Sequence, residues 1–175
     1  MNKRALLCCL LLMCLIGSHS AAHAEVSSKD IQVVASALGF IDGAPSGSVN
    51  LGIVYSEANA QSTNEANALK AMLGAGLTVG NLTLKPVLVK IGDVAGAGNI
   101  AAFFLTDGVG AEASQLTATL KSKRKACVTT DFTQVQSAVC AMGIKSEPKV
   151  EIVVNKAAAA DAGISFSAAF RMMIT

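Results

Sequence analysis

Acidic side chains follow four predicted strands of this sequence, and paired carboxylates can carry out acid–base chemistry such as glycoside hydrolysis. These acids are Glu57, Asp93, Asp107 and Asp131, and their polar neighbours are Tyr55, Ser56, Thr106, Thr129 and Thr130. Ligands of an open α/β sheet bind in the crevice beyond the carboxyl ends of its strands, so we expect these residues to line such a crevice. The competing interpretation, which we favour for most of them, is that Asp and Ser at strand ends cap helices and form turns.

Histidine occurs only as His19 and His23, close to the amino terminus. The rest of the chain therefore cannot form a Ser-His-Asp site, a Cys-His site or a zinc site that contains histidine.

The glycine-rich string from Gly96 to Ala101 is followed too closely by the next strand to be a dinucleotide-binding turn, so we interpret it as an ordinary turn. We expect a protein that is not an enzyme, with no catalytic residues, no metal and no cofactor.

Residues 1–24 have the pattern of a cleavable export signal. Met1–Arg4 is short and basic, Ala5–Ile16 is apolar, and Ala22–Ala24 has the small-x-small form of a cleavage site. The apolar segment is far shorter than the ~20 residues of a membrane-spanning helix. We therefore expect a periplasmic protein that does not itself span the membrane, with residues 25–175 forming a single domain.

Lys3 and Arg4 account for the formal charge of +2 of the whole chain, so residues 25–175 carry equal numbers of acidic and basic side chains. This balance argues against a nucleic-acid partner, which requires a basic surface. Only 15% of the residues are charged, against roughly 25% in a typical protein. The low fraction predicts extensive apolar surface, part of which would serve a homodimer or partner interface.

Two cysteines, Cys127 and Cys140, follow the signal segment. In an exported chain such a pair favours one structural disulfide. Two buried free thiols and a redox-active pair are the alternatives.

The basic run Lys121–Lys125 could bind an acidic partner or a phosphate, but cations also suit the C-terminus of a helix, and we favour that solvated role.

Strands and helices alternate along the predicted elements. Strands are expected at Val49–Tyr55, Leu82–Ile91, Ile100–Thr106, Ala126–Thr130, Val139–Ile144 and Lys149–Asn155, and helices at Asp30–Phe40, Asn59–Leu73, Gly110–Leu120, Lys156–Ala162 and Ser167–Ile174. The alternation predicts an α/β fold with an open, mainly parallel sheet and helices on both faces, and the last two strands add an antiparallel edge. Pro86 implies that its strand either starts at Val87 or lies on an edge at that point.

The C-terminal third carries a family resemblance. Lys125–Asp131 reads as a strand ending in Asp, and Val150–Asn155 as a strand ending in Asn, followed by Ala158-Ala159, Ala162-Gly163-Ile164 and Ser167. This arrangement resembles the YfiR-like family of small periplasmic proteins. The resemblance implies a fold like one lobe of a periplasmic binding protein.

The resemblance also implies a regulator that contacts the periplasmic domain of an inner-membrane diguanylate cyclase and holds it inactive. Redox sensitivity through disulfides is part of this expectation, with Cys127 and Cys140 as the candidate pair. The alternatives are a small-molecule binding component of a transport system and, less favoured, an enzyme that uses carboxylates alone.

Overall fold

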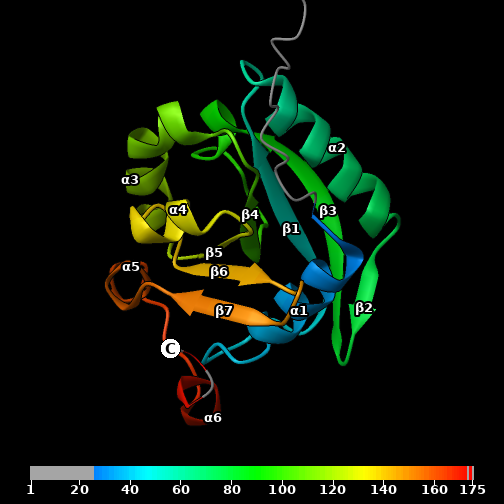
Figure 1. The fold of residues 1–175 in the computed structure, drawn as a ribbon, viewed down its shortest axis with the longest axis vertical. Coiled ribbons are helices and arrows are strands. Elements are labelled where there is room, and N and C mark those ends of the chain that lie inside the picture. Colours follow the sequence, from blue (N-terminus) through cyan, green and yellow to red (C-terminus); the bar gives the residue numbers. More distant parts are fainter. Residues whose placement is uncertain (1–25, 173, 175) are drawn as a thin grey trace, which may run out of the picture.

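The computed structural model describes residues 26–172 and residue 174, which form one seven-stranded sheet with helices around it (Figure 1). The expected signal segment lies outside the described residues. The strands are β1 (Gly47–Tyr55), β2 (Leu77–Val79), β3 (Leu82–Lys90), β4 (Ala102–Leu105), β5 (Ala126–Thr129), β6 (Met142–Lys145) and β7 (Glu151–Val154). Their order in the sheet is β2-β3-β1-β4-β5-β6-β7. The predicted α/β fold with a mainly parallel sheet is confirmed.

The five central strands are parallel, and β2 and β7 close the two edges in the antiparallel sense. β1 lies between β3 and β4, so the chain runs outward from β1 first in one direction and then in the other. This reversal is a topological switch point, beside which open α/β sheets form their ligand crevice. In this chain the switch point lies between the ends of β1 and β4.

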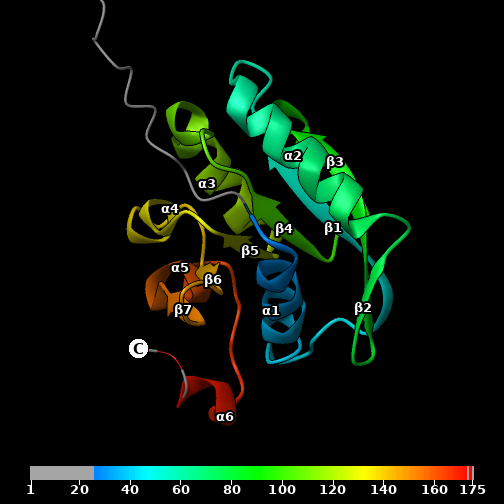
Figure 2. The ribbon, with the colours of Figure 1, turned by 45° about the vertical axis from the view of Figure 1, so that its right-hand side comes forward.

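Helices cover both faces of the sheet (Figure 2). They are α1 (Ser28–Leu38), α2 (Ala60–Leu73), α3 (Ala113–Lys123), α4 (Phe132–Gln136), α5 (Lys156–Asp161) and α6 (Ala168–Arg171). Polar residues expected near the starts of α1 and α2 act as N-caps: Ser27 forms a capping box with Asp30, and Asn59 accepts a hydrogen bond from the Ser62 amide.

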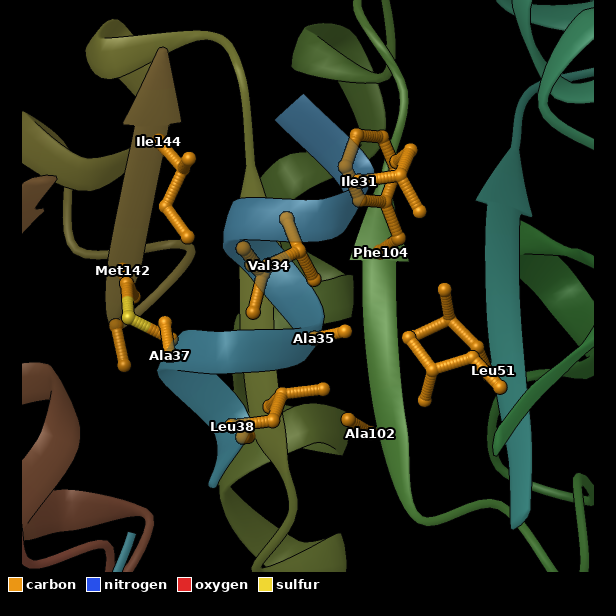
Figure 3. Close-up of a cluster of buried hydrophobic side chains, with 14 of the residues drawn as sticks. Ile31, Val34, Ala35, Ala37, Leu38, Leu51, Ala102, Phe104, Met142 and Ile144 are labelled. Atoms are coloured by element: carbon orange, nitrogen blue, oxygen red, sulfur yellow. The ribbon is translucent and has the colours of Figure 1, made fainter. Parts of the chain in front are cut away.

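One hydrophobic core lies under α1 and α2. Figure 3 shows Ile31, Val34 and Leu38 of α1 among side chains of β1, β4 and β6, including those of Phe104 and Met142. All five are at most 1% exposed. The smaller core on the opposite face is built from Phe103, Leu105 and other residues, with Leu116 and Leu120 supplied by α3.

The connection from β3 to β4 contains no α-helix. Residues 91–101 form a short 3₁₀ turn, η1 (Ile91–Asp93), and then a loop. The face of β3 and β1 opposite to α2 is consequently covered by a loop, and the large cavities described below lie beneath it.

The starts of β3 and β6 differ from, or decide between, the starts predicted from the sequence. β3 begins at Leu82, not at Val87, and β2 pairs only with residues 82–84, so Pro86 lies where β3 has become an edge strand. β6 begins at Met142, three residues later than expected, because the Val139 and Cys140 amides donate hydrogen bonds to the carbonyl of Gln134 in a turn that ends α4. Neither β2 nor α4 is predicted from the sequence.

Cys127 in β5 and Cys140 just before β6 form a disulfide with a Cα–Cα distance of 4.9 Å. The expectation of a disulfide, as opposed to two free thiols, is confirmed. Within the described residues, no helix is both long and apolar enough to cross a membrane.

Candidate functional site

The carboxyl ends of β1 and β4 are joined by buried hydroxyl groups. The Ser62 and Thr106 hydroxyls are 2.6 Å apart, and the Thr106 hydroxyl donates to the Val54 carbonyl at 2.9 Å. The Ser56 amide donates to the Ser62 hydroxyl at 3.0 Å. Ser56, Ser62 and Thr106 are all buried. These polar groups at the switch point are therefore bonded to one another and do not face open solvent.

Glu65 of α2 extends this arrangement toward the end of β4. Its Oε2 accepts a hydrogen bond from the Asp107 amide at 2.8 Å, and its Oε1 is buried without a hydrogen-bond partner among the described residues. Burial is the main cause that raises the pKa of Glu65 to about 7, the negative charges of Asp107 and Asp131 add to it, and the Asp107 amide opposes it. Glu65 is thus half-protonated near neutral pH.

Sequence reasoning did not single out Glu65. The available signal was its position three residues after Ser62, on the same face of α2 and within the first two turns of the helix that follows β1. Because α2 returns across the sheet, its first two turns lie beside the carboxyl ends of the strands.

Thr129, Thr130 and Asp131, at the end of β5, are held by local bonds. The Asp131 carboxylate accepts hydrogen bonds from the Thr133 amide (2.9 Å) and hydroxyl (2.7 Å), and Thr129 accepts one from the Asp131 amide at 3.0 Å. Asp131 is thus the N-cap of α4, as the capping interpretation predicts. Thr129 and Thr130 are buried.

Gln134 of α4 completes this part of the edge. Its Nε2 donates to the Thr106 carbonyl at 2.9 Å, while its Oε1 is buried without a hydrogen-bond partner among the described residues. The structure therefore brings Ser56, Thr106, Asp107 and Asp131 into one region, together with Glu65 and Gln134. No described group of three or more His, Cys, Asp or Glu side chains is arranged to hold a metal ion.

The remaining predicted residues lie at the ends of β1 and β3. Tyr55 and Asp93 line a cavity of about 740 Å³ beneath the 91–101 loop, with Lys90 beside them. Glu57 is exposed and forms an ion pair with Lys90 at 2.9 Å. The nine predicted residues thus fall into two groups. One contains residues joined by hydrogen bonds or packed at the ends of β4 and β5: Ser56, Thr106, Asp107, Thr129, Thr130 and Asp131. The other, at the ends of β1 and β3, contains Tyr55, Glu57 and Asp93.

A second cavity, of about 690 Å³, lies farther back along the same face, near the start of β1. It is lined by Asn50, Lys85, Asn99, Lys123 and Lys125, among others, and by no acidic residue. Sequence reasoning identified the basic run that contains Lys123 and Lys125, but not its meeting with Lys85.

The homodimer or partner interface expected from composition stays a prediction. Among the described residues, the exposed large hydrophobic side chains are Met72, Val150 and Met172. They belong to α2, the turn before β7 and the end of α6, and so do not come from one element.

No protein-family model matches the sequence, and a search of curated proteins finds no significant match.

Proposed function

We propose that this chain is an exported regulatory protein that binds the periplasmic domain of an inner-membrane diguanylate cyclase and holds the cyclase inactive. The partner class comes from the resemblance of residues 125–175 to the YfiR-like family. One observation supports a role without catalysis. At the switch point the Ser62 and Thr106 side chains are fully buried, and their hydroxyl groups are hydrogen-bonded to each other. An enzyme of this topology would bind its substrate beside these groups, and their bonding to one another supports action through the outer surface.

The C-terminal segment gives the proposal a definite surface. β7 is an edge strand that pairs only with β6, and its burial is incomplete along Glu151–Val153. Asn155 then caps α5 by accepting a hydrogen bond from the Ala158 amide at 3.0 Å, so the resemblance motif forms the corner between β7 and α5. We place the cyclase contact at this edge of the sheet.

The test compares cyclic-di-GMP in cells that carry the gene, lack it, or express it from a plasmid. We expect deletion to raise cyclic-di-GMP and the full chain to restore the original level. A variant without residues 1–24 is the matched control, and we expect it to fail because it is not exported. Capture of the tagged full chain from crosslinked envelopes should recover a membrane protein with a cyclase domain. Unchanged cyclic-di-GMP in the deletion strain would exclude this function.

A second candidate, a small-molecule binding component of a transport system, is favoured by one observation: the two cavities of about 690 and 740 Å³ beneath the 91–101 loop. Volumes of this size are in the range of small-molecule sites. Recovery of a transporter permease in the envelope capture, with no cyclase, would favour this candidate.

A further inference from the structure

The 690 Å³ cavity, called here the lysine cavity, is defined by Ser48, Asn50, Lys85, Asn99, Lys123 and Lys125. Its lysines come from two parts of the chain, β3 and the segment from the end of α3 to the start of β5. Lys85 lies in the middle of β3, opposite Asn50 of β1 in the parallel register. Lys123 lies in the last turn of α3, and Lys125 immediately precedes β5. The fold thus brings together side chains that are distant in sequence.

Within the part of the chain that the structure describes, Lys85, Lys123 and Lys125 form no ion pair with an acidic side chain. The ion pairs among the described residues involve Lys29, Lys90 and Lys121, none of which lines the cavity. No Asp or Glu lines it either. A concave site lined by one sign of charge focuses the potential and raises the local concentration of counter-ions. The lysine cavity is therefore an attractive site for an anion.

The position of Lys123 alone has an ordinary explanation, because cations stabilise helix C-termini. Lys85 does not lie at a helix end: it projects from β3, on the same face of the sheet as Val87 and Val89, beside the stretch where β3 is an edge strand. The Lys123 ammonium also donates to the Ala97 carbonyl at 3.2 Å, which fixes it against the loop that covers the cavity. The dipole of α3 therefore accounts for the position of Lys123 but not for the presence of Lys85 in the same cavity.

The cationic side chains of the cavity are all lysines, and this bears on which anion it would bind. Arg124 stands between Lys123 and Lys125 in sequence, yet its guanidinium lies against Gly163 and lines a different cavity. The lysine cavity therefore offers ammonium groups without a guanidinium. Lysine binds phosphate as a point charge, whereas arginine makes bidentate contacts with carboxylate and phosphate alike. Three ammonium groups without a guanidinium suit the nearly double negative charge of a phosphoryl group. The side chains of Asn99 and Ser48 add neutral polar groups at the same wall.

Apolar side chains lie beside these charges. Ile100 and Phe103 line the lysine cavity, and Ile100 also lines the 740 Å³ cavity together with Val87 and Val89. Gly52 lets Phe103 and Ile100 pack directly on β1, because a Cβ atom there would lie 2.8 Å from Cδ1 of Phe103 and 3.1 Å from Cγ2 of Ile100. We propose that the lysine cavity binds a small organic phosphate, with the phosphoryl group among Lys85, Lys123 and Lys125 and the organic part against Ile100. This site does not depend on the proposed cyclase partner.

The experiment titrates the protein, purified after expression of the full chain, with three probes and follows amide chemical shifts by NMR. The probes are phenyl phosphate, inorganic phosphate and citrate. Phenyl phosphate combines a phosphoryl group with an apolar ring, inorganic phosphate lacks the ring, and citrate has carboxylates only. We expect affinity to fall in that order, with the largest shifts in residues 97–101.

Lys85→Gln and Lys123→Gln each remove one charge from the site, and each should weaken phenyl phosphate binding roughly tenfold. Lys70→Gln is the matched control, because Lys70 is exposed on α2 and does not line the cavity. Thermal denaturation of every variant checks that it is folded. Absence of binding by phenyl phosphate, citrate affinity equal to that of phenyl phosphate, or an equal loss in Lys70→Gln would overturn the proposal.

Discussion

The carboxylate of Glu65, in the middle of α2, accepts a hydrogen bond from the backbone amide of Asp107, at the end of β4, over 2.8 Å. This bond connects the helix to the strand on the far side of the switch point. Only one of the two carboxylate oxygens is satisfied in this way among the described residues. The result is a half-buried acid with a buried, unpartnered carboxylate oxygen, and its negative charge destabilises the folded state.

The first prediction concerns the pH dependence of stability. The pKa of Glu65 rises from its ordinary value near 4.5 to about 7 in the folded protein, chiefly through burial. Between these values the folded state binds more protons than the unfolded state, so stability falls as pH rises from 4.5 to 7 and the full cost is present above pH 7. We expect Glu65→Gln to stabilise the protein by on the order of 1–3 kcal/mol at pH 8 and to have little effect at pH 4.5.

Urea denaturation of both proteins at the two pH values measures this difference. Glu57→Gln is the control, because Glu57 is an exposed partner of Lys90 and its replacement should not stabilise at pH 8. An equal effect of Glu65→Gln at pH 4.5 and pH 8 would contradict the prediction.

A second buried carboxylate has the opposite behaviour. Asp30 of α1 accepts hydrogen bonds from the Ser27 amide (2.8 Å), the Ser27 hydroxyl (2.7 Å) and the Ser146 amide (2.7 Å). Burial alone would raise the pKa of Asp30, but these hydrogen bonds outweigh it and hold the pKa below the ordinary value of 3.8. Its contribution to stability is therefore present above pH 3.8 and is lost as pH falls through the lowered pKa.

We expect Asp30→Ala to destabilise the protein at pH 7 by roughly 1.5–3 kcal/mol, since it leaves a buried amide unbonded at Ser146. Chemical denaturation measures the loss. Asp161→Ala is the comparison, because Asp161 forms an exposed ion pair with Lys121 and such pairs contribute about 0–1 kcal/mol. Equal losses in the two variants would show that the Asp30 bonds are not special.

The third prediction concerns the disulfide. Cys127 and Cys140 are 13 positions apart, and closing a loop of this size constrains the unfolded chain by about 3 kcal/mol. Replacing both cysteines with alanine should therefore lower the free energy of unfolding by about that amount. Treatment of the wild type with a reductant should give the same loss, while the double variant should not respond to reductant. If the double variant unfolds at the same urea concentration as the oxidised protein, the bond contributes nothing.

The fourth prediction tests the packing of α4 on β6. A Cβ atom at Gly143 would lie 2.7 Å from Cδ1 of Phe132 and 2.8 Å from Cγ2 of Val135, so Gly143→Ala should destabilise by roughly 1–3 kcal/mol. At Gly92 no atom lies within 4 Å of an added Cβ, and Gly92→Ala should be nearly neutral. Thermal denaturation of both variants makes the comparison, and equal melting temperatures would refute the close contact.

The sequence predicts the strands and helices whose periodicity or caps are strong, such as β5 and the start of α2 at Asn59. It does not predict β2 or α4, because three to five residues are too few to show a period. The crevice is predicted in part: the ends of β1, β4 and β5 do meet, but Glu57 and Asp93 belong to a separate group. Glu65 and Lys85 were not predicted, because their environments depend on how α2 crosses the sheet and on the register of β3 against β1.

The disulfide has a further consequence for the integrity of the chain. The loop that it closes contains all of α4, while β6, β7, α5 and α6 follow it in sequence. A protease that cut the backbone once within this loop would leave two polypeptides linked through sulfur. Such a nicked molecule would run as one band on a non-reducing gel and as two after reduction, and its C-terminal piece could not diffuse away.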